Sequence, residues 1–268
     1  MSSPATPLTR AQSARIRELL RDKRARNTEG AFIIEGAKSV YDALLYHPTS
    51  VQSVVVAIDY ERQESHRHRG LRKSRNIPSF YCPSRTFSTF STLETPQGIL
   101  AVVRQPRWSE ETLLRQSRLF GLYGEQLQDP ANVGTIIRTA AALNIDALWL
   151  TPESADIYNP KVVRASAGAV LSLPIFVAED VVRLTRKGIV VFAAEAAERK
   201  AVKMEIIRTI PKRLILAVGN ESRGLSALTS EQAACRFTIP LSRHIESLNV
   251  AATTAIALHY FSQVGTED

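Results

Sequence analysis

The chain has 268 residues, 44% of them hydrophobic, which is enough for two domains that each have a core of their own. No apolar run approaches the length of a membrane span, and two distant cysteines, Cys82 and Cys235, exclude a disulfide framework and a CxxC zinc site. The formal net charge of +8 is uneven: residues 1–104 hold 16 lysines and arginines against 9 aspartates and glutamates, whereas residues 105–268 hold 18 against 17, so a polyanion would be drawn to the first part.

The first part alternates helical and extended patterns, which predicts a compact α/β domain over residues 1–104 with a mainly parallel or mixed sheet. A linker is expected over residues 105–112, where few residues are apolar, and a second domain over residues 113–268. Within the first domain the expected helices are Gln12–Lys23, Ala37–Tyr46 and a basic helix or helix–loop over Glu61–Asn76, and the expected strands are Ala31–Glu35, Val51–Ile58, Ser79–Cys82 and Gly98–Val103.

Cations are dense around the first predicted helix. Arg21, Lys23, Arg24 and Arg26 lie at its end, and they are our candidates for contacts to a nucleic-acid backbone. A second basic run surrounds His66–Arg67–His68. Two histidines among so many cations make a poor metal site, so we expect no metal there and a solvated or phosphate-facing surface instead.

The second part alternates strands and helices in short units, which predicts a doubly wound α/β domain. At the start of the chain, Met1–Arg10 is polar and has no apolar leader, so we expect a cytoplasmic protein. The expected strands are Leu119–Tyr123, Ala147–Leu150, Ser172–Val177, Ile189–Ala194, Leu214–Val218 and Phe237–Pro240, and the expected helices are Asn132–Leu143, Pro160–Gly168, Asp180–Arg186, Thr229–Ala234 and Glu246–Phe261.

Three of these strands are followed by polar loops. In open α/β sheets ligands bind beyond the carboxyl ends of the strands, so these loops are the candidate site. Taken alone, the Ser and Asn of the third loop would be read as an ordinary helix cap. The loops are Gln128–Ala140, Val218–Leu225, and Ile239–Leu241 with Glu246–Ala252.

Common nucleotide and hydrolase motifs do not account for these loops. Gly219–Ser226 has the glycine spacing of a P-loop, but Leu225 stands where the phosphate-binding lysine is needed, so an NTPase is excluded. No GxGxxG and no GxSxG occurs, which disfavours a dinucleotide site and a hydrolase elbow.

In their order and spacing the three loops resemble the motifs of the SpoU (TrmH) family of RNA ribose 2′-O-methyltransferases, which belongs to the SPOUT class. The resemblance implies an α/β fold with a C-terminal trefoil-knot methyltransferase domain. The stretch from Arg21 to Gly36 is similar to the smaller N-terminal, L30e-like substrate-binding domain of such enzymes, so the basic residues there become candidate RNA contacts. Periodicity alone does not yield the knot, which general chain rules disfavour.

The resemblance also implies S-adenosylmethionine as cofactor and assigns residues to it. By their positions in the motifs, the resemblance assigns cofactor binding to Gly219, Ile239 and Leu248. Glycine at 219 would let the backbone approach the ligand closely. Ile239 and Leu248 would supply apolar walls and main-chain hydrogen bonds, although without the motif both would be read as ordinary core.

Five further residues are implied for catalysis. Arg138 corresponds to the catalytic arginine, either as a general base or as a grip on the target phosphate that also stabilises a ribose oxyanion; the second role is physically easier because a guanidinium stays protonated. Asn132 would orient the loop or the ribose. Glu221 would hold Arg138 or a backbone N–H, unless it merely caps a helix. Ser247 and Asn249 would bind the substrate or the methionine end of the cofactor.

The sequence departs from the family pattern at Ser222 and Arg243, where glycines are common, which affects the expected path of both loops. We therefore predict an RNA 2′-O-methyltransferase that acts on ribosomal RNA. A transfer-RNA enzyme and a catalytically silent RNA-binding protein are the alternatives. The resemblance further implies a homodimer that pairs through the helix Glu246–Phe261, without membrane or metal.

Overall fold

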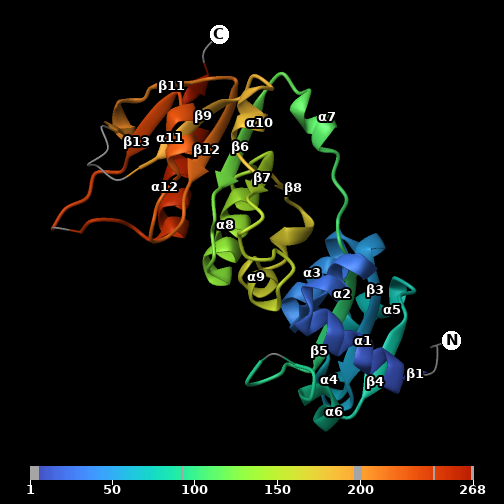
Figure 1. The fold of residues 1–268 in the computed structure, drawn as a ribbon. Coiled ribbons are helices and arrows are strands. Elements are labelled where there is room, and N and C mark those ends of the chain that lie inside the picture. Colours follow the sequence, from blue (N-terminus) through green and yellow to red (C-terminus); the bar gives the residue numbers. More distant parts are fainter. Residues whose placement is uncertain (1–5, 92, 196–200, 244, 267–268) are drawn as a thin grey trace. The chain divides into compact units, whose positions relative to one another are not determined.

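The computed structural model describes residues 6–91, 93–195, 201–243 and 245–266, and the chain divides into two compact units (Figure 1). Unit 1 comprises Met1–Arg107 and Tyr158–Leu171, and unit 2 comprises Trp108–Ile157 and Ser172–Asp268. Among the described residues, no helix combines the length and the apolar character needed to cross a membrane.

Unit 1 is built on a mixed five-stranded sheet, in agreement with the prediction. The strand order is β1-β4-β3-β5-β2, with β4 parallel to β1 and β3, and β5 antiparallel to β3 and β2. The strands are β1 (Thr6–Pro7), β2 (Ala31–Glu35), β3 (Val51–Ala57), β4 (Ser79–Cys82) and β5 (Ile99–Arg104).

Short helices pack on this sheet. The apolar residues Ile16 and Leu19 of the first helix are buried against Ile33, Val55 and Leu100 of the sheet. The helices of unit 1 are α1 (Arg10–Arg21), α2 (Lys23–Glu29), α3 (Ala37–Tyr46), α4 (Ile58–Gln63), α5 (His66–Ser74), α6 (Ser84–Ser88) and α9 (Pro160–Ala165), with 3-10 turns η1 (Pro48–Ser50) and η2 (Ala169–Leu171).

Two predicted helices of unit 1 are in fact broken by a capping residue. Asp22 has an extended backbone, and its side chain accepts a hydrogen bond from the Arg24 N–H, so α1 ends before it and α2 begins after it. Ser65 caps α5 in the same way through the His68 N–H. The helix predicted over Gln12–Lys23 is therefore present as α1 but ends before Asp22. The segment Glu61–Asn76, predicted as a basic helix or helix–loop, contains the end of α4 and the whole of α5, separated at Glu64 and Ser65.

A buried ion pair fixes α5 to the rest of unit 1. The Arg72 guanidinium donates two hydrogen bonds to the Glu64 carboxylate, at 2.7 and 3.1 Å, and a third to the Tyr81 hydroxyl at 2.7 Å. The Tyr41 hydroxyl donates to the same carboxylate. Burial opposes the charge of Glu64, but these hydrogen bonds and the neighbouring guanidinium outweigh it, so the pKa of Glu64 lies below its ordinary value.

Unit 2 contains a seven-stranded, fully parallel sheet in the order β10-β13-β9-β12-β6-β7-β8. Its strands are β6 (Leu119–Gly124), β7 (Ala147–Leu150), β8 (Ile175–Val177), β9 (Val190–Ala194), β10 (Val202–Lys203), β12 (Arg213–Val218) and β13 (Cys235–Thr238). A separate parallel pair joins β11 (Thr209–Ile210) to β14 (Gly265–Thr266). All six strands predicted from the sequence are present, and the short β10, β11 and β14 were missed.

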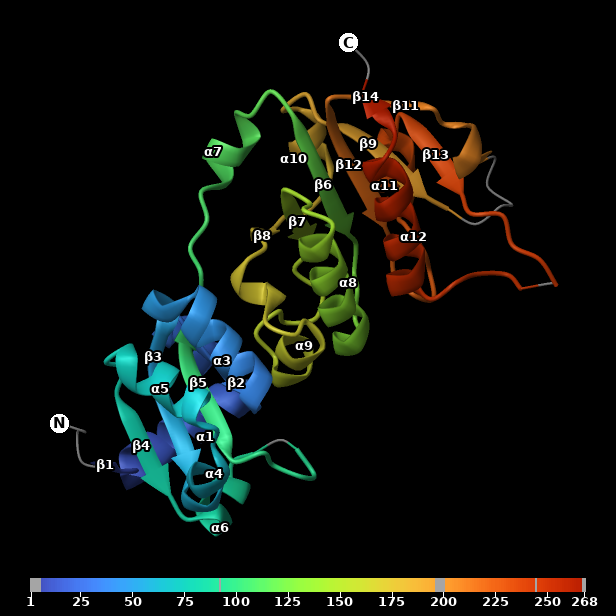
Figure 2. The same cartoon turned by 180° about the vertical axis from the view of Figure 1, so that it is seen from behind.

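Helices cover both faces of this sheet, as a doubly wound fold requires (Figures 1 and 2). The helices are α7 (Glu110–Leu114), α8 (Pro130–Ala142), α10 (Val182–Thr185), α11 (Ala227–Gln232) and α12 (Val250–Ser262), with a 3-10 turn η3 (Met204–Ile206). On one face α8 packs against α12. On the other, Leu184 of α10 lies in one core with Tyr123, Trp149 and Ile215 of the sheet.

The segment expected as a linker, residues 105–112, overlaps the first residues of helix α7, which belongs to unit 2. Its first residue, Glu110, accepts hydrogen bonds from the Trp149 indole at 2.7 Å and from the Arg183 guanidinium at 2.7 and 2.8 Å. The pairing with Arg183 is the main reason that the pKa of Glu110 lies below its ordinary value. Polar composition alone suggested a linker, but this ion pair gives the helix a fixed place.

Candidate active site

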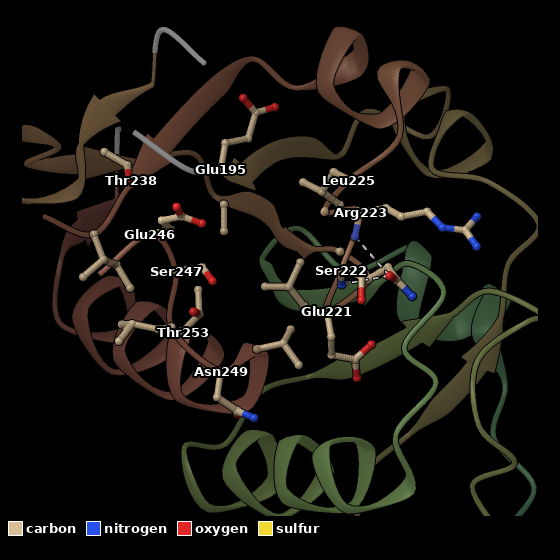
Figure 3. A pocket seen from close by; sticks show the side chains of 18 of the residues that line it. Glu195, Glu221, Ser222, Arg223, Leu225, Thr238, Glu246, Ser247, Asn249 and Thr253 are labelled. Carbon is tan, nitrogen blue, oxygen red and sulfur yellow. Dashed lines mark hydrogen bonds between the residues drawn. The ribbon is translucent and has the colours of Figure 1, made fainter. Parts of the chain in front are cut away.

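A pocket of about 570 Å³ lies beyond the carboxyl ends of three neighbouring strands of unit 2, β12, β9 and β13 (Figure 3). Its wall includes the loop after β12 at residues 219–225, the residues after β13, and the segment 245–250 that leads into α12. This size is typical of a pocket for a small organic ligand. Six residues singled out from the sequence line it: Gly219, Glu221, Ile239, Ser247, Leu248 and Asn249.

The loop after β12 is held in a fixed path by Asn220. Asn220 and Gly224 exchange backbone hydrogen bonds at 3.1 and 2.9 Å, and Gly224 has φ +71°. The Asn220 carboxamide oxygen accepts from the backbone N–H groups of Ser222 and Arg223, while its amide donates to the Gln126 carbonyl at 2.8 Å. Asn220 lies inside the second motif but was not among the predicted site residues.

The path of this loop by itself requires glycine at position 219. A Cβ at this position would lie 2.2 Å from the Gly224 carbonyl carbon and 2.3 Å from the Leu225 nitrogen. No side chain fits there unless the loop moves. The close approach of the backbone to itself is thus a second reason for glycine at 219, beside the predicted approach to a ligand, which stays a prediction.

A chain of side-chain hydrogen bonds ties the three motif loops together. The Asn249 amide donates to the Asn132 carboxamide oxygen at 2.9 Å, and the Asn132 amide donates to the Glu221 carboxylate at 3.0 Å. Glu221 also lies 3.4 Å from the Asp129 backbone nitrogen, which donates to it. Although burial opposes its charge, these donors outweigh that effect and the pKa of Glu221 lies below its ordinary value.

This chain also fixes which way each amide points. A carboxylate can only accept, so the Asn132 amide nitrogen must face Glu221 and its oxygen must face Asn249. The Asn249 oxygen in turn accepts from the N–H groups of Ala251 and Ala252, which begin α12. The helix therefore starts at Val250, not at Glu246 as predicted, which leaves Ser247 and Leu248 in the loop that lines the pocket.

Arg138 lies apart from the pocket wall. It is on the exposed face of α8, one turn after Thr135, and is not among the residues that line the pocket. Its guanidinium makes no hydrogen bond or ion pair with the residues that the structure describes. Glu221 does not hold Arg138; it accepts from Asn132 and from backbone N–H groups instead.

Of the four cations proposed for nucleic-acid contacts in unit 1, three are exposed and one is not. Arg21, Lys23 and Arg24 are exposed at the junction of α1 and α2. Arg26 is only 3% exposed, and its guanidinium donates to the Leu19 carbonyl at 2.7 Å. Its assignment as an RNA contact is therefore wrong, because this guanidinium is part of the packing between α1 and α2.

Glu195 is a further polar residue of the pocket that was not predicted from the sequence. Glu195 follows β9 directly and lines the pocket (Figure 3). Both of its carboxylate oxygens are buried, and neither has a hydrogen-bond partner among the residues described. Its place directly after the predicted strand Ile189–Ala194 was the one available signal, but no motif marked this strand end as part of the site.

Comparisons with known proteins cover both units. A model of the SpoU rRNA Methylase family matches residues 120–259, and a model of the MRM3-like substrate binding domain matches residues 14–101. The 23S rRNA (guanosine(2553)-2′-O)-methyltransferase RlmP of Bacillus subtilis is 32% identical over 244 residues, which are 90% of this chain and 92% of that protein.

Two solved structures are similar over nearly the whole chain. The AdoMet-bound rRNA methyltransferase from Sinorhizobium meliloti is 28% identical with a TM-score of 0.79, over 96% of this chain and 95% of that one. A putative RNA methyltransferase of the TrmH family from Porphyromonas gingivalis is 31% identical with a TM-score of 0.76, over 95% of this chain and 98% of that one.

Proposed function

The chain belongs to the SpoU rRNA methylase family, and we propose that it methylates a ribose 2′-hydroxyl of ribosomal RNA. It is an S-adenosylmethionine-dependent RNA 2′-O-methyltransferase with the α/β trefoil-knot fold of the SPOUT class, as the three motifs predicted. The observation that carries the proposal is the chain of hydrogen bonds from Glu221 through Asn132 to Asn249, because it joins all three motif loops beside one pocket.

The residues of the pocket fit such a cofactor. Ile239 and Leu248 give apolar surface for a planar base, and the loop fixed by Asn220 presents backbone groups to the same space. The buried carboxylate of Glu195 accepts no hydrogen bond from any described residue, which suits a ligand with hydrogen-bond donors. Bound S-adenosylmethionine would supply an electrophilic methyl group on a sulfonium.

Arg138 is suited to hold RNA rather than to remove a proton. Its guanidinium is exposed and has no partner among the described residues, so it is available to a phosphate. A guanidinium stays protonated at neutral pH, which makes it a poor base and a good stabiliser of a developing ribose oxyanion. Asn132 and Glu221 would act by keeping the loops in place, and Ser247 is exposed in the pocket wall where it can contact the substrate.

Ribosomal RNA is the substrate that the named relatives favour, and exposed Arg21, Lys23 and Arg24 of unit 1 would bind its backbone. A transfer-RNA enzyme is the alternative within the class. A catalytically silent RNA-binding protein is disfavoured, because binding alone needs no hydrogen-bond chain among the three loops. The division of labour between residues 1–104 and 113–268 and the cytoplasmic location stay predictions.

We also propose that the enzyme is a homodimer that pairs through α12. Part of the apolar surface expected for this helix is buried in its own unit, since Val250, Leu258 and Phe261 are at most 7% exposed. Ile256, however, is 41% exposed and borders a groove with Met204, Tyr260 and Val264. A self-complementary patch of this kind is what two-fold symmetry requires.

The function is tested by mapping ribose methylation in ribosomal and transfer RNA from cells with and without this gene. Loss of one ribosomal 2′-O-methyl group, restored by the purified enzyme with S-adenosylmethionine, is the expected result. Loss of a transfer-RNA methyl group would replace the proposed substrate. Unchanged methylation together with no binding of S-adenosylmethionine in calorimetry would overturn the proposed activity.

Light scattering at micromolar concentration tests the dimer, which an active monomer would contradict.

A further inference from the structure

Glu195 occupies a position between the two loops assigned to the cofactor. Gly219 follows β12 and Ile239 follows β13, and the sheet order places β9 between these two strands. Glu195 comes directly after β9, and its backbone N–H donates to the Phe237 carbonyl of β13 at 2.9 Å. The sheet therefore fixes the backbone of Glu195 at the pocket wall, between both cofactor loops.

The side chain of Glu195 is the unusual part. Both carboxylate oxygens are shielded from solvent, and no described residue donates a hydrogen bond to either of them. Buried carboxylates in folded proteins are nearly always paired, because an unpaired one loses its hydration without compensation. Since none of the residues that the structure describes is a donor to it, we look for the donor in a ligand of the adjoining pocket.

On the basis of the proposed methyltransferase function, we propose that the Glu195 carboxylate binds the ribose hydroxyls of the cofactor. Two free oxygens on one carbon match two adjacent hydroxyl donors, which a ribose presents and an adenine amino group does not. An acidic residue in a comparable place, near the end of a parallel strand, binds the ribose in dinucleotide-binding folds. In the view of Figure 3, Glu195 lies across the pocket from Glu221 and Asn249, whose hydrogen bonds join the motif loops.

The test compares two ligands by calorimetry: S-adenosylhomocysteine and its analogue without the 2′- and 3′-hydroxyls of the ribose. Glu195→Ala should weaken the binding of S-adenosylhomocysteine by about tenfold to a hundredfold, as expected for hydrogen bonds to a charged group. Glu195→Gln should lose less, because its amide keeps one acceptor. Both variants should bind the dideoxy analogue as well as the parent does.

A matched control is Glu246→Gln, which removes the same charge from the same pocket at an exposed position. Its ratio of affinities for the two ligands should equal that of the parent. The melting temperature without ligand gives a second readout. Glu195→Gln should melt no earlier than the parent, because it removes a buried carboxyl group to which no described residue donates a hydrogen bond, whereas loss of a structural carboxylate would leave a less stable protein.

Three results would overturn the inference. If the Glu195 variants bind S-adenosylhomocysteine as tightly as the parent, the carboxylate does not contact the cofactor. If they weaken both ligands equally, the carboxylate binds another part of the cofactor, such as its ammonium group. If they weaken binding only together with a lower melting temperature, the role is structural. A parent protein that binds neither ligand would instead refute the proposed function.

Discussion

Replacing Asn132 by alanine should loosen the three motif loops, because Asn132 is the middle member of the hydrogen-bond chain. The side chain is 8% exposed and makes one bond to the Glu221 carboxylate at 3.0 Å and one with the Asn249 amide at 2.9 Å. A neutral hydrogen bond contributes about 1 kcal/mol, and one to a carboxylate about 1.5–3 kcal/mol. Because Glu221 is exposed, we take the lower end, which gives a loss of about 2–3 kcal/mol and a melting temperature about 4–12 °C lower.

Calorimetric unfolding of the single and double variants decides whether the chain acts as a unit. Glu221→Ala should cost about 1–2 kcal/mol, and the double variant should fall short of the sum by about 1 kcal/mol, since both changes remove one shared bond. Thr135→Ala, on the exposed face of the same helix, is the control and should stay within about 0.5 kcal/mol of the parent. Methyl transfer should fall in Asn132→Ala. Additive losses within about 0.5 kcal/mol would refute the coupling.

Arg138→Ala should abolish methyl transfer while cofactor affinity in calorimetry stays within about twofold, and Arg138→Lys should fail largely, because one ammonium cannot replace a planar fork; full activity in Arg138→Ala would rule out its role. Neutral replacements of Arg21, Lys23 and Arg24 together should weaken RNA binding and flatten its dependence on salt in filter binding, with the slope reduced by about one unit per lost phosphate contact; an unchanged slope would place the RNA elsewhere. The pKa of Glu64 is lowered in the folded state, so its contribution to stability is fully present above the unfolded pKa and is lost as the pH falls through the folded pKa. Denaturant unfolding from pH 7 to pH 3 should show this loss in the parent and a smaller one in Glu64→Gln, and equal slopes would contradict it.

The sequence predicted most of the sheet because strands are marked by local runs. Ala31–Glu35 and Ala147–Leu150 match the structure at both ends, since each is an apolar run bounded by polar residues or glycine. Helix ends were less predictable. Asn249 is the cap that its residue type suggested, yet the helix was predicted to begin at Glu246, and the cap at Asp22 was not expected. The burial of a charged side chain could not be predicted either. Arg26 counts as a cation in any sequence, and only the fold shows that it faces the Leu19 carbonyl.

The residues of the candidate site that lie in a motif could be predicted from the sequence. The residue that only the order of the strands brings to the site could not. The residues that line the pocket after β12 and β13 follow from the resemblance to known motifs. Glu195 does not, because β9 lies between β12 and β13 in space although both follow it in the chain. The order of strands in a sheet arises from long-range packing, and no local pattern around Glu195 contains it.

The interleaved path of the chain has a consequence for taking this protein apart. The backbone crosses between the units three times, after Arg107, after Ile157 and after Leu171, because the segment with α9 is counted with unit 1. A fragment that stops at Arg107 would leave Phe32 without the Tyr158 ring, whose centroid lies 4.8 Å away. Val162 and Val163, both buried, would be lost from the same fragment. Excision at the first boundary therefore removes part of a core. A fragment that keeps the whole of unit 1 must join residues 158–171 to residues 1–107 through a linker.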